Sequence, residues 1–483
     1  MTATNTTEPF VVIGGDAAGL SAASKLKREA PHRDAIVFEK GSWVSYAHCG
    51  TPYFVKGDVE TLTDLLSLSP SDIRDRGIDL RRNHEVIAVS PMEQTVTVRG
   101  PDGEKIHQSY GDLLVATGAR ALSEPISGSQ LDGVFTLHGL DSAANVRAFL
   151  SDPAEFTVES LGGDGYVDEA TATRYGAMTP PETVAIVGGG YVGIEMAEAF
   201  SAWELDVHLF QRSDHVLPPF GTAVAERVEP HLDEQGVTLH LGTEVAEFSG
   251  EDGRVDSLAC SNGTELAVDA ALVGIGIRPN VQLAAETAVT LGDSGAIAID
   301  EYGRTSVDHV YAAGDCAEMP HVVTGENTWV PLGLTANRAG RAIGQTVAGN
   351  PTPVGRIAGT AVVKAFDLEC GRVGLTNLDR ARDAGFDPVS ETITAGSRSG
   401  YYPGVAETTV RLVADRKSGR LLGGSIVGGD RAAIRIDTLA TALEGELSIE
   451  EVERLDLAYA PPFSPVWDPI LVAAKVLNGQ ISS

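Results

Sequence analysis

The sequence predicts an α/β fold with two Rossmann-like domains followed by a C-terminal α+β domain. Two segments have the order apolar strand, glycine-rich turn, helix and second strand, the pattern of a βαβ unit that binds a dinucleotide. They begin at residues 10–13 and 184–187. Beyond residue 350, alternating stretches are typical of strands, and an amphipathic stretch at about 430–454 is typical of helices. Two complete units indicate this fold far more strongly than a single glycine motif does.

The first glycine turn, GGDAAG, matches the dinucleotide pattern at its outer positions, Gly14 and Gly19, but has Asp16 at the middle one. In this pattern the first glycine allows a tight turn, the last lets the helix pack on the strand, and the helix N-terminus attracts phosphate. The next strand (35–38) ends at Glu39, which we expect to bind the ribose hydroxyls of an adenosine. Further candidates for contact with the nucleotide are Ala17 and Lys40.

The second glycine turn has the full GxGxxG pattern, formed by Gly188, Gly190 and Gly193. Its second strand (206–210) ends at Gln211 and Arg212, where an acidic residue is typical of an NAD site. A carboxylate would repel the 2′-phosphate of NADPH, whereas glutamine and arginine can accept it. The sequence therefore favours NADPH over NADH as the nicotinamide cofactor.

The chain of 483 residues is long enough for about three domains and carries a strong negative charge. Its 36 Lys and Arg against 67 Asp and Glu give a formal net charge of −31. This charge disfavours nucleic acids and anionic membranes as partners, because the field of the protein repels phosphate. An acidic, Lys-poor composition is typical of proteins from halophiles, in which salt screens the self-repulsion.

The cysteine and hydropathy patterns indicate a reduced, cytoplasmic setting. The four cysteines show neither a disulfide framework nor the spacing of zinc ligands, so we expect no metal site. The N-terminal segment lacks the basic and apolar regions of a secretory signal. No apolar run approaches the roughly 18 residues that would predict a membrane helix.

Three further segments show a resemblance to a known family. They are YGDLLVATGAR (110–120), GIGIRPN (274–280) and VYAAGDCAEM (310–319). Together with the two glycine turns, they resemble the FAD-dependent pyridine nucleotide-disulfide oxidoreductases over nearly the whole chain. The resemblance implies FAD in the first Rossmann domain, NAD(P)H in the second and a homodimer formed through the C-terminal domain. It also implies FAD contacts from Thr117, Gly118 and Asp315, with Glu195 near the isoalloxazine ring.

The motifs divide the chain into three expected domains. We expect an FAD-binding domain at residues 1–142 and 275–350, split by an NAD(P)H-binding domain at 143–274, and a dimerisation domain at 351–483. An acidic, irregular stretch at about 151–180 is predicted to be a surface insertion or an extended connection.

The thiol pattern indicates a branch of this family. Other members carry two cysteines, C-x4-C, after the first Rossmann unit, whereas Cys49 is alone here, with Val44 and Phe54 five residues away on either side. The segment SYAHCGTPYF (45–54) resembles the coenzyme A-disulfide reductases and, in part, the single-cysteine NADH oxidases and peroxidases. The latter usually have a His where this chain has Ala17. A lone thiol can cycle only through a sulfenic acid or a mixed disulfide with a small thiol.

Two C-terminal segments strengthen the resemblance to the coenzyme A-disulfide reductases. They are SGYYPG (399–404) and AYAPPFSPVWDP (458–469). The resemblance implies that two tyrosines of the partner subunit meet the sulfur of the substrate. These are Tyr401, with Tyr402 as its neighbouring alternative, and Tyr459.

The expected substrate contacts depart from the family pattern at one position. The resemblance implies contacts from Ser45 and from an Asn before the cysteine, which is His48 here. His48 could also keep Cys49 as a thiolate, because a nearby imidazolium lowers the pKa of a thiol. Since coenzyme A carries several phosphates, a basic cluster must override the negative field of the chain. We expect this cluster to include Lys25 and Arg28.

The expected reaction is the reduction of coenzyme A disulfide, or of a similar small disulfide, by NAD(P)H. FAD would pass electrons from NAD(P)H to a Cys49–S–S–CoA mixed disulfide, and the freed Cys49 thiolate would attack the next disulfide. Alternatives on the same scaffold are an NAD(P)H oxidase and a polysulfide reductase, in which Cys49 forms a sulfenic acid or a persulfide. A non-catalytic, redox-responsive flavoprotein is a remoter alternative, which the residues around Cys49 disfavour.

Overall fold

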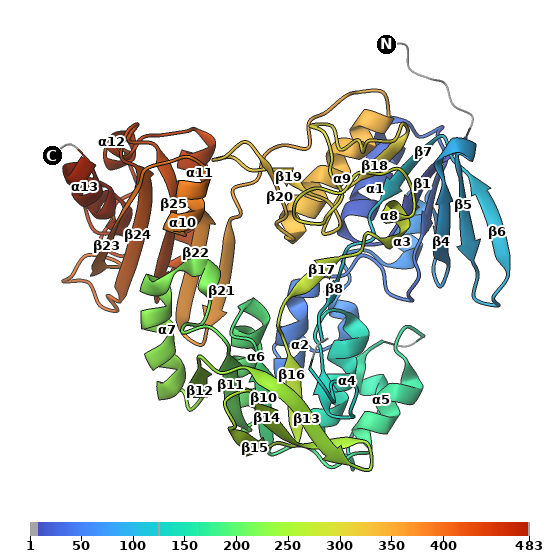
Figure 1. Cartoon of the computed structure of the whole chain (residues 1–483), viewed down its shortest axis with the longest axis horizontal. Coiled ribbons are helices and arrows are strands. Elements are labelled where there is room, and N and C mark those ends of the chain that lie inside the picture. The colour runs from blue at the N-terminus through green and yellow to red at the C-terminus, as the bar shows by residue number, and fades with distance from the viewer. Residues whose placement is uncertain (1–7, 124–125, 164, 482–483) are drawn as a thin grey trace.

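The computed structural model describes residues 8–123, 126–163 and 165–481. In Figure 1 the first Rossmann-type domain lies at the upper right, the second lies at the bottom, and the C-terminal domain lies at the left. The predicted α/β fold is confirmed, with its two parallel sheets and its separate antiparallel sheet near the C-terminus.

The first domain is built on a parallel sheet in the order β18-β7-β1-β2-β3. Its central strand, FVVI, is buried at every position, as expected for a parallel strand that is covered on both faces. The five strands are β1 (Phe10–Ile13), β2 (Ala35–Phe38), β3 (Asp79–Arg81), β7 (Asp112–Val115) and β18 (Val310–Ala312). The antiparallel strands beside them are β4 (Glu85–Ser90), β5 (Thr95–Arg99) and β6 (Lys105–Ser109), and the helices are α1 (Ala17–Glu29), α3 (Pro70–Asp75), α8 (Gln282–Ala285) and α9 (Gly333–Val347). The short strands β19 (Met319–Pro320) and β20 (Asn327–Thr328) pair with each other in the segment between β18 and α9.

Helix α9 shows that the chain returns to the first domain after completing the second. It packs directly on α1, because two glycines leave room for the other backbone. A Cβ at Gly340 would lie 2.1 Å from the carbonyl oxygen of Ala18, and one at Gly344 would lie 2.2 Å from that of Ala22. Residues far apart in the sequence therefore form one core.

The second domain has a parallel sheet in the order β12-β11-β10-β16-β9. Its strands are β9 (Val134–Phe135), β10 (Thr183–Val187), β11 (Asp206–Gln211), β12 (Thr238–Leu241) and β16 (Ala270–Val273). An antiparallel sheet of β13 (Val245–Glu251), β14 (Arg254–Cys260) and β15 (Glu265–Ala267) flanks it, and the helices are α4 (Leu140–Leu150), α5 (Glu169–Gly176), α6 (Tyr191–Ala202) and α7 (Thr222–Glu234). Helix α2 (Thr51–Lys56), which follows the cysteine segment of the first domain, packs on α6 and α4.

The crossing between the two domains lies earlier in the chain than the boundary expected at residue 142. Strands β8 (Ala119–Ala121) and β17 (Ile277–Pro279) pair antiparallel where the chain leaves and re-enters the first domain (Figure 1). Strand β9 already belongs to the second sheet, in which it pairs with β16. Strand β17 begins at Ile277, close to the returning boundary expected near 275. A two-residue strand such as β9 leaves no periodic pattern in a sequence.

The acidic stretch at about 151–180 is folded and partly buried, unlike the surface insertion that the sequence predicts. It contains the 3-10 helix η4 (Val158–Leu161) and helix α5. Leu161, Ala172 and Tyr175 are buried in the core of the second domain. The apolar positions are too few and too irregularly spaced to predict this packing, which the neighbouring helix α4 provides.

The C-terminal domain is an antiparallel sheet covered by helices, as the sequence predicts. The sheet has the order β21-β22-β25-β24-β23, formed by β21 (Ala361–Ala365), β22 (Leu368–Gly374), β23 (Pro388–Gly396), β24 (Glu407–Asp415) and β25 (Leu421–Gly428). Its helices are α10 (Leu378–Asp383), α11 (Ile436–Glu444), α12 (Ile449–Glu453) and α13 (Pro469–Ile481).

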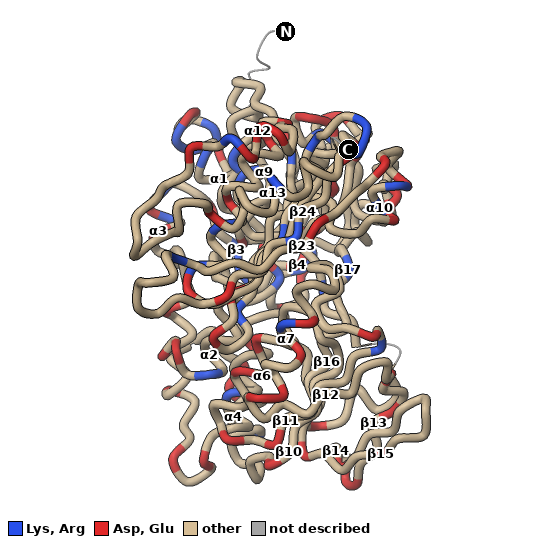
Figure 2. Tube along the Cα trace, turned by 90° about the vertical axis from the view of Figure 1, so that its left-hand side faces the viewer, with Lys and Arg blue, Asp and Glu red and all other residues tan. Residues whose placement is uncertain are grey.

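Acidic residues are spread over all three domains, which places the negative charge over the whole molecule (Figure 2). Within the described residues, no helix has the length and apolar character needed to cross a membrane. The same part of the chain holds no group of three or more His, Cys, Asp or Glu side chains suited to a metal ion.

Candidate active site

The first glycine turn is shaped to bring a dinucleotide close to its backbone. Gly14 has a φ of +112°, and a Cβ there would lie 2.1 Å from the carbonyl oxygen of Ala116. A Cβ at Gly19 would lie 2.0 Å from the carbonyl oxygen of Gly14, so α1 can begin here only with glycine at this position. Glu39, directly after β2, accepts a hydrogen bond from the backbone N–H of Gly15 (2.9 Å). The turn and the carboxylate that the sequence predicts to bind ribose thus form one unit.

The second turn repeats this backbone geometry. Gly188 has a φ of +111°, and a Cβ there would lie 2.4 Å from the carbonyl oxygen of Gly274. A Cβ at Gly193 would lie 1.9 Å from the carbonyl oxygen of Gly188. Gly190 has no atom within 4 Å of such a Cβ, which leaves its backbone open to a ligand. Both turns therefore fit a dinucleotide.

The residues at the end of β11 have separate roles. Gln211 is buried and accepts a hydrogen bond from the backbone N–H of Gly189 (3.0 Å), as Glu39 does from Gly15 in the first domain. Gln211 therefore holds the turn. Arg212 is exposed and lines the cavity described next, so it is the residue of the pair with a charge free to meet a 2′-phosphate.

One continuous cavity of about 2930 Å³ joins both glycine turns to the cysteine segment in the described part of the chain. It exceeds the roughly 300–1,000 Å³ of an ordinary ligand pocket, as expected for a site that holds more than one large ligand. The predicted site residues that line it are Gly14, Ala17, Arg28, Glu39, Lys40, Ser45, His48, Cys49, Thr117, Gly118, Gly188, Gly190, Glu195, Gln211, Arg212 and Asp315. Those outside its lining are Gly19 and Gly193, which serve helix packing, and Lys25, Tyr401 and Tyr459.

Cys49 is the candidate for the redox-active thiol in this cavity. It lies in the short 3-10 helix η1 (His48–Gly50) and is exposed, whereas the other three cysteines are buried. Its surroundings in the cavity, which displace water, and the negative charges of Glu195 and Asp315 raise the pKa of the Cys49 thiol. Because the thiolate is the nucleophile, these neighbours hold the thiol in its less reactive form near neutral pH.

Glu195 faces the cysteine segment with a partner that the sequence analysis did not single out. The hydroxyl of Tyr53 donates a hydrogen bond to Glu195 Oε1 (3.1 Å). Burial raises the pKa of Glu195 to about 7, although the Tyr53 hydrogen bond opposes this shift. The spacing of four residues between Cys49 and Tyr53 was a usable signal, since α2 follows the cysteine directly.

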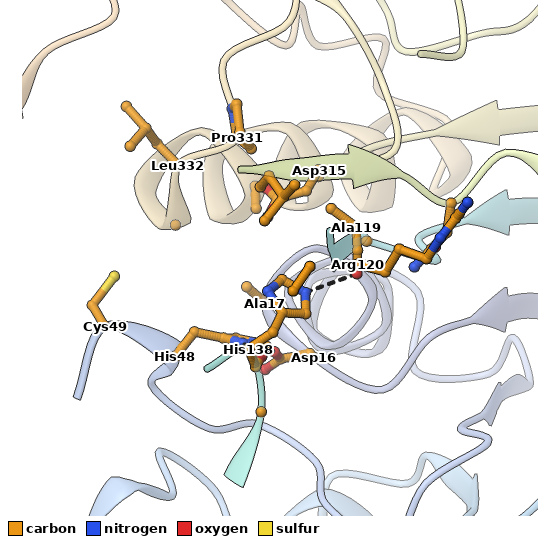
Figure 3. A pocket seen from close by; sticks show the side chains of 18 of the residues that line it. Asp16, Ala17, His48, Cys49, Ala119, Arg120, His138, Asp315, Pro331 and Leu332 are labelled. Carbon is orange, nitrogen blue, oxygen red and sulfur yellow. Dashed lines mark hydrogen bonds and ion pairs between the residues drawn. The ribbon is translucent and has the colours of Figure 1, made fainter. Parts of the chain in front are cut away.

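His48 is directed away from the cysteine sulfur. Its ring points toward Asp16 and His138, while the side chain of Cys49 points to the other side (Figure 3). The geometry therefore gives no support to the hypothesis that His48 keeps Cys49 as a thiolate. Ser45 is buried beside the first turn, and its backbone N–H donates to the carbonyl oxygen of Gly15 (3.0 Å).

The two basic residues predicted on α1 differ in their surroundings. Lys25 is buried and its ammonium group pairs with Glu29, so it does not reach the cavity. Arg28 lines the cavity together with Arg76 and Arg341. Among the described residues these three arginines form no salt bridge, although Arg76 donates a hydrogen bond to Ser24 Oγ (3.2 Å). Arg76 and Arg341 have no signal in the sequence, because they come from separate elements that only the fold brings to α1.

Tyr401 and Tyr459 meet on the surface of the C-terminal domain. The two residues are 78% and 49% exposed, and the hydrogen bond between their hydroxyl groups raises the pKa of Tyr459. Arg435 ties the two loops together: it donates to the carbonyl oxygen of Ser397 (2.7 Å) and pairs with Asp468 (3.0 Å). Neither tyrosine lines the cavity of its own subunit, which fits a role in the cavity of a partner subunit.

The similarity to known proteins agrees with this architecture. A family model described as pyridine nucleotide-disulphide oxidoreductase matches residues 8–330. The chain belongs to this family. A second model, for the dimerisation domain of these oxidoreductases, matches residues 360–469. The protein is therefore an oxidoreductase of a family whose typical cofactors are FAD and NAD(P)H, and it carries that family's dimerisation domain.

Relatives within the family carry different names. The chain is 39% identical to an NAD(P)H coenzyme A polysulfide/persulfide reductase of Pyrococcus horikoshii, over 98% of this chain and 99% of the relative. It is 28% identical to a coenzyme A disulfide reductase of Staphylococcus haemolyticus, over 94% and 96%. The solved structure of an NAD-dependent persulfide reductase from A. fulgidus superposes with a TM-score of 0.88 at 32% identity, over 98% of this chain and 83% of that one. These relatives share sulfur chemistry but differ in the sulfur compound.

Proposed function

We propose that the protein reduces coenzyme A disulfide, or a similar low-molecular-weight disulfide, with NAD(P)H through a Cys49–S–S–CoA mixed disulfide. The position of Cys49 carries the proposal, because this exposed thiol opens into the cavity that both glycine turns line. The other three cysteines are buried, so Cys49 has no second thiol with which to form an internal disulfide. With a disulfide as substrate, electrons would then pass through a bond between Cys49 and that substrate.

The residues of the two turns fit the two nucleotides. The first turn and Glu39 would hold the adenosine end of FAD, and Thr117, Gly118 and Asp315 would hold the remainder. The second turn and Arg212 would hold NAD(P)H, with NADPH favoured. When bound, FAD accepts a hydride from NAD(P)H and passes two electrons on to sulfur. Gly118 supports this placement, because its backbone has no neighbouring atom within 4 Å of a Cβ position and is open to the cavity.

Cys49 would act as a thiolate in two half-reactions. Its sulfur attacks one sulfur of the disulfide, so that a new S–S bond forms and one coenzyme A thiolate leaves. Two electrons then cleave the mixed disulfide, which returns the Cys49 thiolate and releases the second coenzyme A thiolate. One hydride and one proton are consumed for each disulfide that gives two thiols.

Glu195 is suited to exchange the proton that this chemistry needs. Its pKa of about 7 lets it gain or lose a proton near neutral pH. It lies close enough to Cys49 for its charge to raise the pKa of the thiol. Tyr53 orients the carboxyl group through the 3.1 Å hydrogen bond. Tyr459 of the partner subunit, bonded to Tyr401 of the same subunit, would donate a hydrogen bond to the leaving sulfur.

Three arginines of the cavity that form no salt bridge among the described residues support an anionic substrate. Arg28, Arg76 and Arg341 line the cavity in a protein whose net charge is −31. A phosphate-rich substrate is otherwise repelled, so these guanidinium groups would supply the local attraction. Arg28 would belong to this basic cluster, as the sequence predicts, and Arg76 and Arg341 would join it in place of Lys25.

A persulfide or polysulfide substrate is the second candidate, and the higher identity to the Pyrococcus horikoshii enzyme favours it. Cys49 would then attack the outer sulfur of a coenzyme A persulfide and release coenzyme A thiolate. The resulting Cys49 persulfide would yield hydrosulfide on addition of two electrons.

Mass spectrometry and product analysis test the proposal together. We expect the as-isolated protein to carry a mass increment equal to coenzyme A on Cys49 that dithiothreitol removes. With NADPH in excess, coenzyme A disulfide should yield two thiols per NADPH and little oxygen uptake. Hydrosulfide release with a rate far above thiol release would favour the persulfide reaction. Oxygen uptake equal to NADPH consumption, with or without disulfide, would establish an oxidase instead.

A further inference from the structure

One departure from the dinucleotide pattern and one departure from the family pattern meet in a single contact. Asp16 occupies the middle position of the first glycine turn, and His48 occupies the position before the cysteine. In the structure, His48 Nε2 lies 2.5 Å from Asp16 Oδ2. The other carboxylate oxygen of Asp16 accepts a hydrogen bond from the backbone N–H of Tyr46 (3.1 Å). The pair therefore joins the nucleotide turn to the loop that carries Cys49.

The hydrogen-bond partners of His48 define its protonation. Its Nδ1 lies 3.0 Å from the backbone carbonyl oxygen of His138, and its Nε2 faces the carboxylate of Asp16. Carbonyl and carboxylate oxygens only accept hydrogen bonds, so both ring nitrogens must carry a proton. His48 is then an imidazolium. Burial acts to lower the pKa of His48, but the hydrogen bonds to Asp16 and to the His138 carbonyl raise it above its usual value.

The charge of this pair matters because of where Asp16 stands. Asp16 is the residue before α1, at the helix end that attracts the pyrophosphate of a dinucleotide. Its side chain makes no capping hydrogen bond to the helix. Both Asp16 and His48 line the cavity. A lone carboxylate at this position would repel the pyrophosphate, whereas a carboxylate paired with an imidazolium carries no net charge.

We propose that His48 is a positioning residue for FAD, whose imidazolium neutralises Asp16 so that the first turn can accept the pyrophosphate. The same group fixes the cysteine loop beside the turn, because its second nitrogen is bonded to the carbonyl oxygen of His138. The pair thus takes the place of the glycine that the pattern has at the middle position. The inference concerns the cofactor and does not depend on which sulfur compound is reduced.

The test is a double-mutant cycle on FAD affinity, measured by titrating FAD into the stripped apoprotein in 0.1 M salt. We expect His48→Asn to raise the Kd of FAD by about tenfold or more, because Asp16 is left unpaired. Asp16→Gly in the His48→Asn background should restore the Kd to within about threefold of wild type. His309→Asn is the matched control, because His309 pairs with Asp112 (3.2 Å) in the same domain but outside the cavity. Its Kd should equal that of wild type.

Two further readouts separate charge from folding. The loss in His48→Asn should shrink in 1 M salt, which screens the carboxylate. The Kd of wild type should rise as the pH increases through the pKa of His48, whereas the double variant should show no such step. The charged and titratable groups that face His48 are Asp16, Tyr46, His138 and Asp315. An unchanged Kd in His48→Asn, or a double variant as weak as the single one, would overturn the proposal, since removing Asp16 cannot repair a folding defect.

Discussion

At the residue scale, Cys49 differs from the other three cysteines in its surroundings. Cys316 and Cys370 are fully buried, and burial raises the pKa of each. Cys49 is accessible through the cavity, but partial burial and the carboxylates that face it raise its pKa. The opening to the cavity therefore favours reaction at Cys49, whereas the raised pKa lowers the fraction of reactive thiolate.

Replacing Cys49 tests the role of the thiol. We expect Cys49→Ser to lower disulfide reduction by at least roughly a thousandfold, because serine cannot form the mixed disulfide. Bleaching of the flavin by NADPH should persist, since that step does not use the thiol. Stopped-flow absorbance and steady-state thiol release measure the two steps. Cys260→Ala, which removes a buried thiol, serves as the control, and full activity of Cys49→Ser would exclude the mechanism.

Glu195 sets the pH dependence of the thiol. Above about pH 7, where Glu195 is ionised, its charge raises the pKa of Cys49. Glu195→Gln removes this charge, so the pKa of Cys49 should fall and the thiolate fraction at pH 8 should rise. We expect alkylation of reduced protein by iodoacetamide to become several-fold faster at pH 8, with its pH profile shifted to lower pH. Glu226→Gln, which changes an exposed carboxylate, is the control and should leave the pH profile unchanged. An unchanged pH profile in Glu195→Gln would show that the charge of Glu195 does not act on Cys49.

At the element scale, helix α2 depends on its neighbours. It has six residues, too few for a helix to be stable alone. Arg147, from α4, donates to the backbone carbonyl oxygens of Phe54 (2.7 Å) and Val55 (3.2 Å), and Trp203 Nε1 also donates to Val55 (2.8 Å). These donors satisfy carbonyl groups at the C-terminal end of the helix behind Cys49.

Removing the Arg147 donor tests this dependence. Arg147→Met keeps much of the packing on Phe54 but removes the charged donor from the carbonyl oxygens of Phe54 and Val55, which keep only the Gly57 N–H and Trp203 Nε1 as donors. We expect the free energy of unfolding to fall by about 1–3 kcal/mol. The kcat for disulfide reduction should fall more than the rate of flavin reduction, because the cysteine loop loses its support. Denaturant unfolding and stopped-flow kinetics check both, with the exposed Arg227→Met as the control. Equal loss in both rates would argue against a role in placing Cys49.

At the scale of the whole molecule, the active site would be complete only in a dimer. Cys49 lies in the cavity of the Rossmann domains, whereas Tyr401 and Tyr459 lie on the exposed surface of the C-terminal domain. Phe463, Val466 and Trp467 near them are also exposed, as expected for a surface that is covered on dimerisation.

Mixing two inactive variants tests whether the site is shared. Cys49→Ser and Tyr401→Phe/Tyr459→Phe homodimers should each be strongly impaired. After unfolding and refolding of an equal mixture, each heterodimer should contain one intact site, so about a quarter of wild-type activity should return. Size-exclusion chromatography checks that dimers form. No recovery in a sample that contains heterodimers would place the tyrosines in the site of their own subunit.

The net charge of −31 leads to a prediction about salt. Acidic residues lie on all three domains, so their repulsion acts on the whole molecule (Figure 2). We expect the unfolding temperature to rise between 0.1 M and 1 M KCl, because the Debye length falls from about 10 Å to about 3 Å. Differential scanning calorimetry measures this shift. A flat or falling unfolding temperature would contradict the inference of a salt-adapted protein.

The sequence by itself determined the fold class, the two glycine turns, the family and the choice of Cys49. These features rest on local constraints: the turns at Gly14 and Gly188 need glycine because their φ values of +112° and +111° are ones that other residues rarely adopt. Such constraints are written in consecutive residues. The folded and partly buried state of the 151–180 stretch was harder to predict, because its few apolar residues become buried only against α4.

Only the tertiary structure decided which side chains share a site. Lys25 and Arg28 are three residues apart on one helix, yet Lys25 is buried and paired while Arg28 reaches the cavity with Arg341. The contacts of Asp16 with His48, and of Tyr53 with Glu195, join residues 32 and 142 positions apart. Their charges and pKa values depend on distances that packing sets, and no pattern in neighbouring residues encodes those distances.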